Sequence, residues 1–175
     1  QAEVLGNLFP LTEPDRYFSI LPTNHAIDFM CGFFLPLQFG AAIVHQRTLR
    51  PQFLGPTMRR YGITHMALVP MLLKKLEERI REKLDELPPW KKTVVDSLIS
   101  VNEMATKRGP KHALSKTLLK PIHDEFGKLQ LMFCGGAFVE RSLAEFFYSL
   151  GLPVCIGYGL TEAGTVLTVN DLKPF

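Results

Sequence analysis

The fold is decided by residues 129–159, which read LQLMFCGGAFVERSLAEFFYSLGLPVCIGYG. The segment begins with an almost continuously apolar run up to Cys134, which is typical of a strand covered on both faces. A glycine pair follows, and residues 139–150 then carry apolar side chains at helical spacing until Gly151 ends the helix. A second apolar run, residues 153–156, completes a strand–helix–strand unit. This change of period predicts an α/β fold with a parallel sheet.

The same alternation runs through the first part of the chain, and one more short strand is expected at residues 165–169. Three further strands and two helices are expected, at residues 15–21, 41–45 and 64–69 and at residues 25–39 and 53–61. The predicted class is therefore α/β, with a mostly parallel sheet flanked by helices.

A long helical stretch follows the third expected strand. Apolar residues recur at four-residue steps over residues 72–84, and the charged residues between them, Glu77 included, predict a solvated face. A second helix is expected at residues 90–107 and a third at residues 110–127. No strand pattern interrupts them, so we expect a helical insertion at about residues 85–127.

The composition excludes several classes of protein. A net charge of +3 over 175 residues, with basic and acidic residues interspersed, indicates no nucleic-acid surface. The three cysteines lack CxxC spacing and lie in apolar runs, which favours buried thiols in a reducing, cytoplasmic setting over disulfides or a zinc site. The apolar residues 26–44 are interrupted by Asp28, Pro36 and Gln38, which favours a buried helix and strand over a membrane span.

Two strand exits are rich in glycine, and in an open parallel sheet ligands bind outside the carboxyl ends of the strands. Gly135, Gly136 and Ala137 follow one strand and leave room for a flat ligand against the backbone. The alternative for this glycine pair is a plain tight turn before the next helix.

The second exit, residues 157–162, reads GYGLTE. Tyr158 can stack on a base, Thr161 can donate to a phosphate oxygen and Glu162 can hold Mg²⁺, and a nucleoside triphosphate needs all three. A dinucleotide fingerprint does not fit, because Glu162 stands where the third glycine of G-x-G-x-x-G belongs. The alternative is an exposed loop in which Thr161 and Glu162 cap the next element.

These residues resemble the adenylate-forming superfamily, which includes acyl-CoA synthetases, beetle luciferases and nonribosomal peptide adenylation domains. The resemblance is carried by residues 158–162 (YGLTE), preceded by residues 135–137 (GGA). Residues 21–25 (LPTNH) look like the family's Leu-Pro-x-x-His segment, and residues 67–70 (ALVP) like its buried strand leading into a helix. The long helical stretch is similar to the insertion in long-chain fatty acyl-CoA synthetases, which points to that branch.

The resemblance implies a role for each of these residues. Tyr158 would stack on the purine, Thr161 would contact the α-phosphate and Glu162 would bind Mg²⁺. The rest of the nucleotide-binding wall would be formed by Gly135, Gly136, Ala137, Gly159 and Leu160.

At the acyl end, the resemblance implies that His25 orients the carboxylate of the substrate. Phe29 and Phe33, with Cys31 between them, would form part of the wall of an acyl tunnel. From the residues alone, a lone histidine at the start of an apolar helix is more often a capping or core histidine than a catalytic one, and core packing explains the two phenylalanines equally well.

The activity implied by the resemblance is an ATP-dependent long-chain fatty acid–CoA ligase that uses Mg²⁺ and takes coenzyme A as co-substrate. The family's phosphate loop and mobile C-terminal domain are not found in residues 1–175, so we expect them in the remainder of the same polypeptide and expect this fragment alone to be inactive. Three alternatives stay open: a different acid or a carrier-protein acceptor, a peripheral membrane contact, and a non-catalytic helical module that docks a partner.

Overall fold

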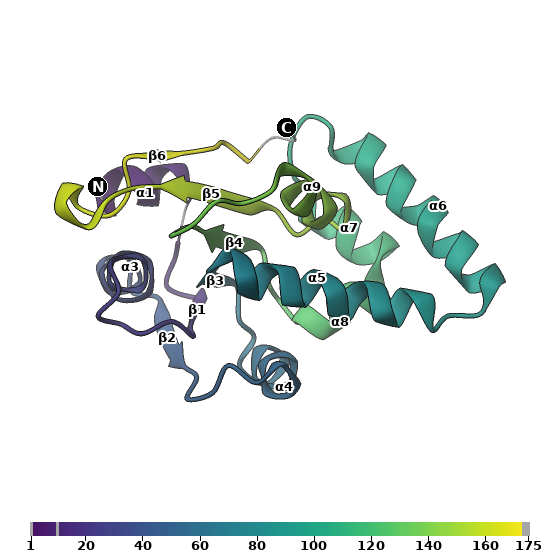
Figure 1. The fold of residues 1–175 in the computed structure, drawn as a ribbon, viewed down its shortest axis with the longest axis horizontal. Helices are drawn as coiled ribbons and strands as arrows, with labels where there is room; N and C mark the ends of the chain where they lie inside the picture. Colours follow the sequence, from purple (N-terminus) through teal and green to yellow (C-terminus); the bar gives the residue numbers. More distant parts are fainter. Residues whose placement is uncertain (1, 10, 173–175) are drawn as a thin grey trace.

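The computed structural model describes residues 2–9 and 11–172, which form one mixed sheet with helices on both faces (Figure 1). The strands run in the order β2-β1-β3-β4-β5-β6. The first five are parallel, and β6 pairs antiparallel with β5, which confirms the predicted mostly parallel sheet. The strands are β1 (Arg16–Ser19), β2 (Ala42–His45), β3 (His65–Leu68), β4 (Leu131–Cys134), β5 (Val154–Tyr158) and β6 (Thr168–Val169).

The helices follow the predicted order, except that the helix Ala2–Leu8 was not expected and two of the expected helices differ in form. The helix predicted at residues 25–39 contains a π-helical segment, and the third helix of the insertion is two helices that meet at Leu119. Pro121 accounts for the break, because proline has no N–H to continue the helix. The helices are α1 (Ala2–Leu8), α2 (Ala26–Asp28), the π-helix η1 (Phe29–Phe34), α3 (Leu35–Phe39), α4 (Pro51–Tyr61), α5 (Pro70–Asp85), α6 (Pro89–Thr106), α7 (His112–Leu118), α8 (Lys120–Phe126), α9 (Arg141–Ser149) and the 3₁₀ turn η2 (Thr161–Ala163).

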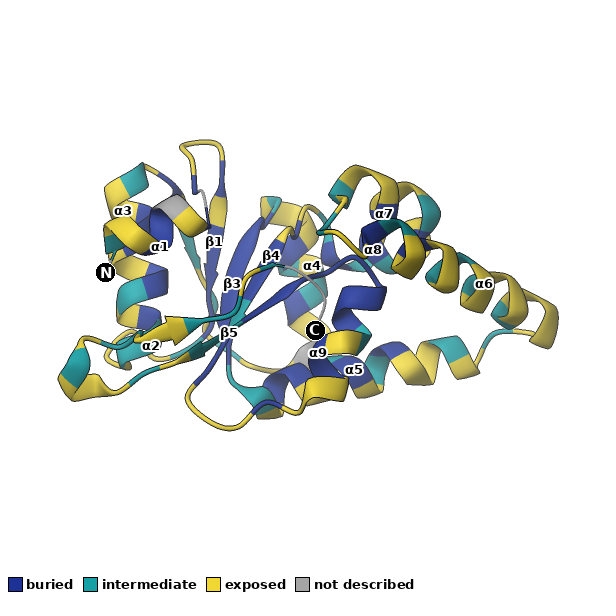
Figure 2. Cartoon of the chain, turned by 90° about the horizontal axis from the view of Figure 1, so that it is seen from above, coloured by how far each residue is buried: buried dark blue, intermediate teal, exposed yellow. Residues whose placement is uncertain are grey.

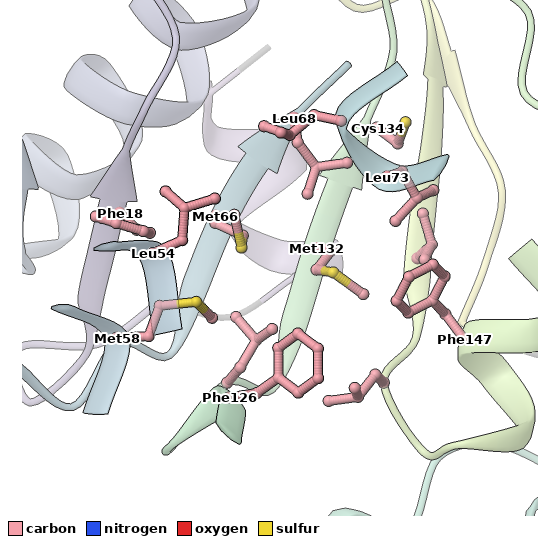
Figure 3. Packing of buried hydrophobic residues seen from close by; sticks show 14 of the residues in the cluster. Phe18, Leu54, Met58, Met66, Leu68, Leu73, Phe126, Met132, Cys134 and Phe147 are labelled. Carbon is pink, nitrogen blue, oxygen red and sulfur yellow. The ribbon is translucent and has the colours of Figure 1, made fainter. Parts of the chain in front are cut away.

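Two hydrophobic cores lie on the two faces of the sheet, because successive strand residues point to opposite sides. On one face, Phe18, Met66 and Met132 pack against side chains of α4, α5, α8 and α9 (Figure 3). On the other face, their neighbours Tyr17 and Ala67 pack with residues of α1, η1 and α3. The apolar runs of β1, β3 and β4 therefore have the burial that the sequence predicts, whereas β2 is an edge strand and only half-buried.

The predicted insertion extends from one end of the sheet (Figure 1). Its helix α6 packs against α7 and α9, and α8 packs against α4. The fully buried Asn102 of α6 donates to the carbonyl oxygen of Ser149 at 2.9 Å and accepts from Ser115 Oγ at 2.7 Å. This amide ties α6 to both α7 and α9, so the inner side of the insertion is fixed to the α/β frame.

Glu77 corrects the expectation that the charged residues of α5 form one solvated face. Its side chain is buried, and its carboxylate accepts from Lys74 Nζ at 2.7 Å and from Arg81 Nε at 2.8 Å. Burial alone would raise the pKa of the Glu77 carboxyl, but the hydrogen bonds from Lys74 and Arg81 outweigh it and hold the pKa below its ordinary value of 4.5. The two basic side chains extend from the buried carboxylate to the surface.

This cluster predicts a pH dependence of stability. Because the pKa is lower in the folded chain, the contribution of Glu77 is present above pH 4.5 and is lost as the pH falls through the folded value. We expect Glu77→Gln to cost on the order of 1–3 kcal/mol at pH 7 in urea unfolding. The difference between wild type and variant should shrink below pH 4.5, and the exposed Glu82→Gln serves as the control. A difference that stays constant down to pH 3 would contradict this prediction.

Candidate functional site

The strand order fixes where a ligand cleft can form. Strand β1 lies between β2 and β3. The connection after β1 leads to η1 and α3 on one face of the sheet, and the connection after β3 leads to α5 on the other face, which leaves room between them at the carboxyl ends of the strands. A cleft of about 490 Å³ lies at this edge of the sheet. Its lining comes from the exits of four parallel strands, including Pro22 after β1, Val69 after β3, Gly135 after β4 and Gly159 after β5.

The glycine pair after β4 is required by close packing at this edge. A side chain on Gly135 would place its Cβ 2.9 Å from the carbonyl oxygen of Gly157 and 3.5 Å from Cδ1 of Ile27. Gly136 has a φ of +83°, in the left-handed region that favours glycine. The exits of β4 and β5 therefore meet through their backbones, and Ile27 lies over them.

The loop after β5 doubles back on itself. Its turn is closed by hydrogen bonds from Thr165 N to the Leu160 carbonyl oxygen at 3.0 Å and from Leu167 N to the Tyr158 carbonyl oxygen at 2.9 Å. Inside the turn, a Cβ on Gly159 would lie 1.4 Å from the carbonyl oxygen of Thr165. Only glycine fits there, so the second glycine of the motif is a requirement of the loop's own path.

The structure brings most of the predicted site residues to this one cleft and leaves four of them, Ala137, Tyr158, Phe29 and Phe33, outside its lining. Ala137 is exposed beyond the glycine pair, and the Tyr158 side chain is 61% exposed. Stacking of Tyr158 on a purine therefore stays a prediction. The predicted residues that line the cleft are His25, Gly135, Gly136, Gly159, Leu160, Thr161 and Glu162.

Phe29 and Phe33 do not line the cleft, so their place in an acyl wall stays a prediction. The helix presents Asp28, Cys31 and Leu35 to the sheet, and the two phenylalanines lie on its outer side. Their rings stack on each other with centroids 6.0 Å apart, and both side chains are more than a third exposed. The sequence is apolar all round this helix, so spacing alone did not select its inner face.

The inner wall of the cleft contains all three cysteines, Cys31, Cys134 and Cys155. Burial raises the pKa of each thiol to about 12. The thiols therefore stay protonated and act as small apolar wall groups, not as nucleophiles. The burial of all three cysteines confirms the prediction of buried thiols. Cys134 and Cys155 line the cleft together with Cys31, for which the resemblance implies a wall position.

Asp28 is the buried polar residue whose role the sequence reasoning missed. Its side chain is fully buried and accepts from Ser19 Oγ at 2.7 Å and from Tyr17 Oη at 3.3 Å, both on β1. Burial raises the pKa of the Asp28 carboxyl, while the hydrogen bonds from Ser19 and Tyr17 oppose the rise. The contact fixes to the sheet the start of the helix that carries His25 and Ile27. In the sequence, the one sign of this role is that Asp28 is a single carboxylate within an apolar run.

The donor set is compatible with Mg²⁺ bound together with phosphate. Within residues 2–9 and 11–172, no three His, Cys, Asp or Glu side chains are placed to hold one metal ion. The exposed Glu162 carboxylate at the cleft can supply one hard oxygen ligand, and Mg²⁺ in phosphate sites is commonly held by one or two carboxylates, phosphate oxygens and water.

The fold and site together define a class of protein. It is an open α/β domain whose ligand cleft lies at the carboxyl ends of parallel strands, with glycine backbone on one wall and a Thr–Glu pair at its edge. A family model described as AMP-binding enzyme matches residues 2–174. The chain belongs to this family of AMP-binding enzymes.

Individual relatives are distant and longer. The chain is 27% identical to long chain acyl-CoA synthetase 1 of Arabidopsis thaliana, over 92% of this chain and 26% of that protein. It is 24% identical to a chloroplastic long-chain-fatty-acid–[acyl-carrier-protein] ligase of the same plant, over 99% of this chain and 28% of that protein. The chain thus spans about a quarter of the length of the curated relatives it matches.

A solved structure shares the fold. The chain matches o-succinylbenzoate coenzyme A synthetase from Bacillus subtilis, in complex with ATP and magnesium ion, with a TM-score of 0.63 and 19% identity. The match covers 97% of this chain and 27% of that one. At this identity the match supports the fold alone and not a substrate.

Proposed function

We propose that this chain is part of an ATP-dependent fatty acid–CoA ligase. The observation that carries the proposal is that His25, the Gly135–Gly136 backbone and the Thr161–Glu162 pair, far apart in sequence, line one cleft. Within it, the glycine backbone would lie against the adenine, Thr161 would contact the α-phosphate and Glu162 would hold Mg²⁺. Tyr158 would stack on the purine after its exposed ring turns toward the cleft.

The proposed reaction has two steps. The fatty acid carboxylate attacks the α-phosphorus of ATP, forming an acyl-adenylate and expelling pyrophosphate, and the thiol of coenzyme A then takes the acyl group and releases AMP. Mg²⁺, when bound, would neutralise charge on the phosphate oxygens. The chain's own residues would act by positioning, with His25 at the carboxylate and Thr161 at the phosphate.

The proposal extends to the organisation of the whole enzyme. The phosphate loop and the C-terminal domain would come from the remainder of the same polypeptide, and residues 85–127 would be an insertion in the N-terminal domain. Residues 1–175 alone would then be inactive. Acyl-CoA formation by this chain on its own would contradict that part of the proposal.

The test is pyrophosphate release by the polypeptide that carries this chain together with the missing parts, across acids of different chain length. We expect Glu162→Gln to lower the rate about 100-fold, because an anionic metal ligand beside the reacting phosphates is lost. Glu86→Gln, at an exposed residue just after the end of α5, is the matched control and should leave the rate unchanged. Equal rates for Glu162→Gln and wild type would contradict the proposed role of Glu162 as a metal ligand.

Two alternatives have distinct outcomes in the same assay. The similarity to an acyl-carrier-protein ligase favours a carrier protein as acceptor in place of coenzyme A, which would appear as pyrophosphate release without acyl-CoA. A non-catalytic module that docks partners through its helices would release no pyrophosphate, and ATP with magnesium would not protect the Tyr158 loop from hydrogen exchange.

A further inference from the structure

The outer side of helix α6 carries an apolar stripe that none of the described residues covers. Trp90, Val94, Val101 and Met104 are 66%, 52%, 45% and 64% exposed. Their spacing at i, i+4, i+11 and i+14 places them in one line along the helix. The buried Asn102 and Thr106 mark the opposite, inward side, and Figure 2 shows the exposed side of α6 turned away from the sheet.

The charge around this stripe is basic. Residues 88–111 contain five basic side chains and two acidic ones, and one of the five, Lys92, is ion-paired with Asp85 of α5. The basic residues lie at both ends of α6, with Lys91 Nζ 5.3 Å from the centre of the Trp90 ring at one end and Lys107, Arg108 and Lys111 at the other. At about 100° per residue, Asp96 and Glu103 fall outside the stripe.

We propose that this face of α6 binds the surface of an anionic lipid bilayer. An exposed apolar stripe with a tryptophan at one end and basic residues at both ends is what a helix lying in a membrane interface presents. The helix would lie in the plane of the surface, its stripe among the headgroups and its basic ends against the phosphates. No helix in the described residues is long and apolar enough to cross a membrane.

A partner helix explains the stripe less well. The spacing of Trp90, Val94, Val101 and Met104 is that of a coiled-coil seam, but the seam has only about two heptads, and Ser97 occupies its middle position. Stable coiled coils need about three or four heptads. The basic ends would also gain nothing from an apolar seam, whereas anionic headgroups complement them.

The test uses Trp90, the single tryptophan of the chain, as the reporter. We expect its emission to shift to shorter wavelength with vesicles of phosphatidylcholine and phosphatidylglycerol, and the chain to co-sediment with them. Vesicles of phosphatidylcholine alone should bind at least tenfold more weakly, because about fivefold in affinity is expected for each basic residue near an anionic surface. Equal binding to both vesicles, or no shift with either, would overturn the proposal.

Substitutions on the stripe locate the surface. We expect Val94→Ser/Val101→Ser/Met104→Ser to lower vesicle affinity tenfold or more, since the apolar area that would leave water is removed. Met71→Ser, at a side chain 70% exposed on α5, is the matched control and should bind like wild type. Far-ultraviolet circular dichroism checks that α6 stays folded in the triple variant. Unchanged affinity of the folded triple variant, or a Trp90 shift that appears on self-association without vesicles, would refute the lipid surface.

Charge variants give a second readout. Lys107→Ser/Arg108→Ser/Lys111→Ser should weaken binding about 100-fold and flatten its salt dependence. Arg47→Ser/Arg50→Ser, which removes two exposed basic residues near the β2 edge, is the control. An equal loss in both variants would indicate attraction by net charge and not by α6. None of these results depends on ATP, so they leave the proposed ligase activity untouched in either outcome.

Discussion

Gly159→Ala is expected to open the loop that follows β5. The added Cβ would lie 1.4 Å from the carbonyl oxygen and 2.4 Å from the carbonyl carbon of Thr165, and both are backbone atoms that cannot turn aside as a side chain can. Forcing them apart should cost about 1–3 kcal/mol. The hydrogen bonds donated by the Thr165 and Leu167 amides would be the first to break.

Hydrogen exchange measures the opening of this loop directly. Protection of the Thr165 and Leu167 amides should fall about ten- to hundredfold in Gly159→Ala, since each factor of ten corresponds to about 1.4 kcal/mol. The matched control is Gly157→Ala, where the new Cβ would meet only Val169 Cγ1 at 3.8 Å, an ordinary contact. Protection in Gly159→Ala equal to that of the control would show that the turn tolerates a side chain. Because Thr161 and Glu162 lie in this turn, its opening should also remove them from the cleft.

Phe147→Ala should produce the largest loss of stability. The Phe147 ring is fully buried between α9 and the sheet and lies edge-on to Phe146 at 5.4 Å (Figure 3). Its removal leaves a cavity beside β4 and β5, the strands whose exits form the glycine wall. We expect a cost of about 3–5 kcal/mol in urea unfolding, which corresponds to a fall of roughly 10 °C in Tm.

Phe138→Ala is the control for that variant. This phenylalanine is 86% exposed just before α9, so its removal should change the free energy of unfolding by less than about 0.5 kcal/mol. A similar loss in both variants would mean that the ring of Phe147 contributes no more than any other apolar surface. An unchanged slope against urea in Phe147→Ala would show that the variant still unfolds from the same compact state.

Much of the site was predictable because its signals are local. Glycines at 135, 136 and 159 follow apolar strands, and the structure shows why, since each is excluded from carrying a side chain by φ or by a backbone contact. The carboxyl ends of parallel strands share one edge, so two glycine-rich exits were expected to meet there. Asp28 was not assigned, because its hydroxyl partners lie on β1 and the sequence gives no sign of that pairing.

The sequence by itself determined the α/β class, the order of the elements and the glycine-lined exits. Periodicity and glycine conformation depend on the backbone near each residue, and a single chain displays them. Only the tertiary structure decided which side of the mostly apolar helix at residues 26–39 faces the sheet. A Cβ on Gly32 would lie 2.5 Å from Asp28 Oδ1 and 2.8 Å from the Tyr17 ring, so only glycine lets this side of the helix pack closely against β1. Phe29 and Phe33 lie on the opposite, exposed side. The tertiary structure also decided that Glu77 is buried. Both outcomes depend on contacts made only once the chain has folded.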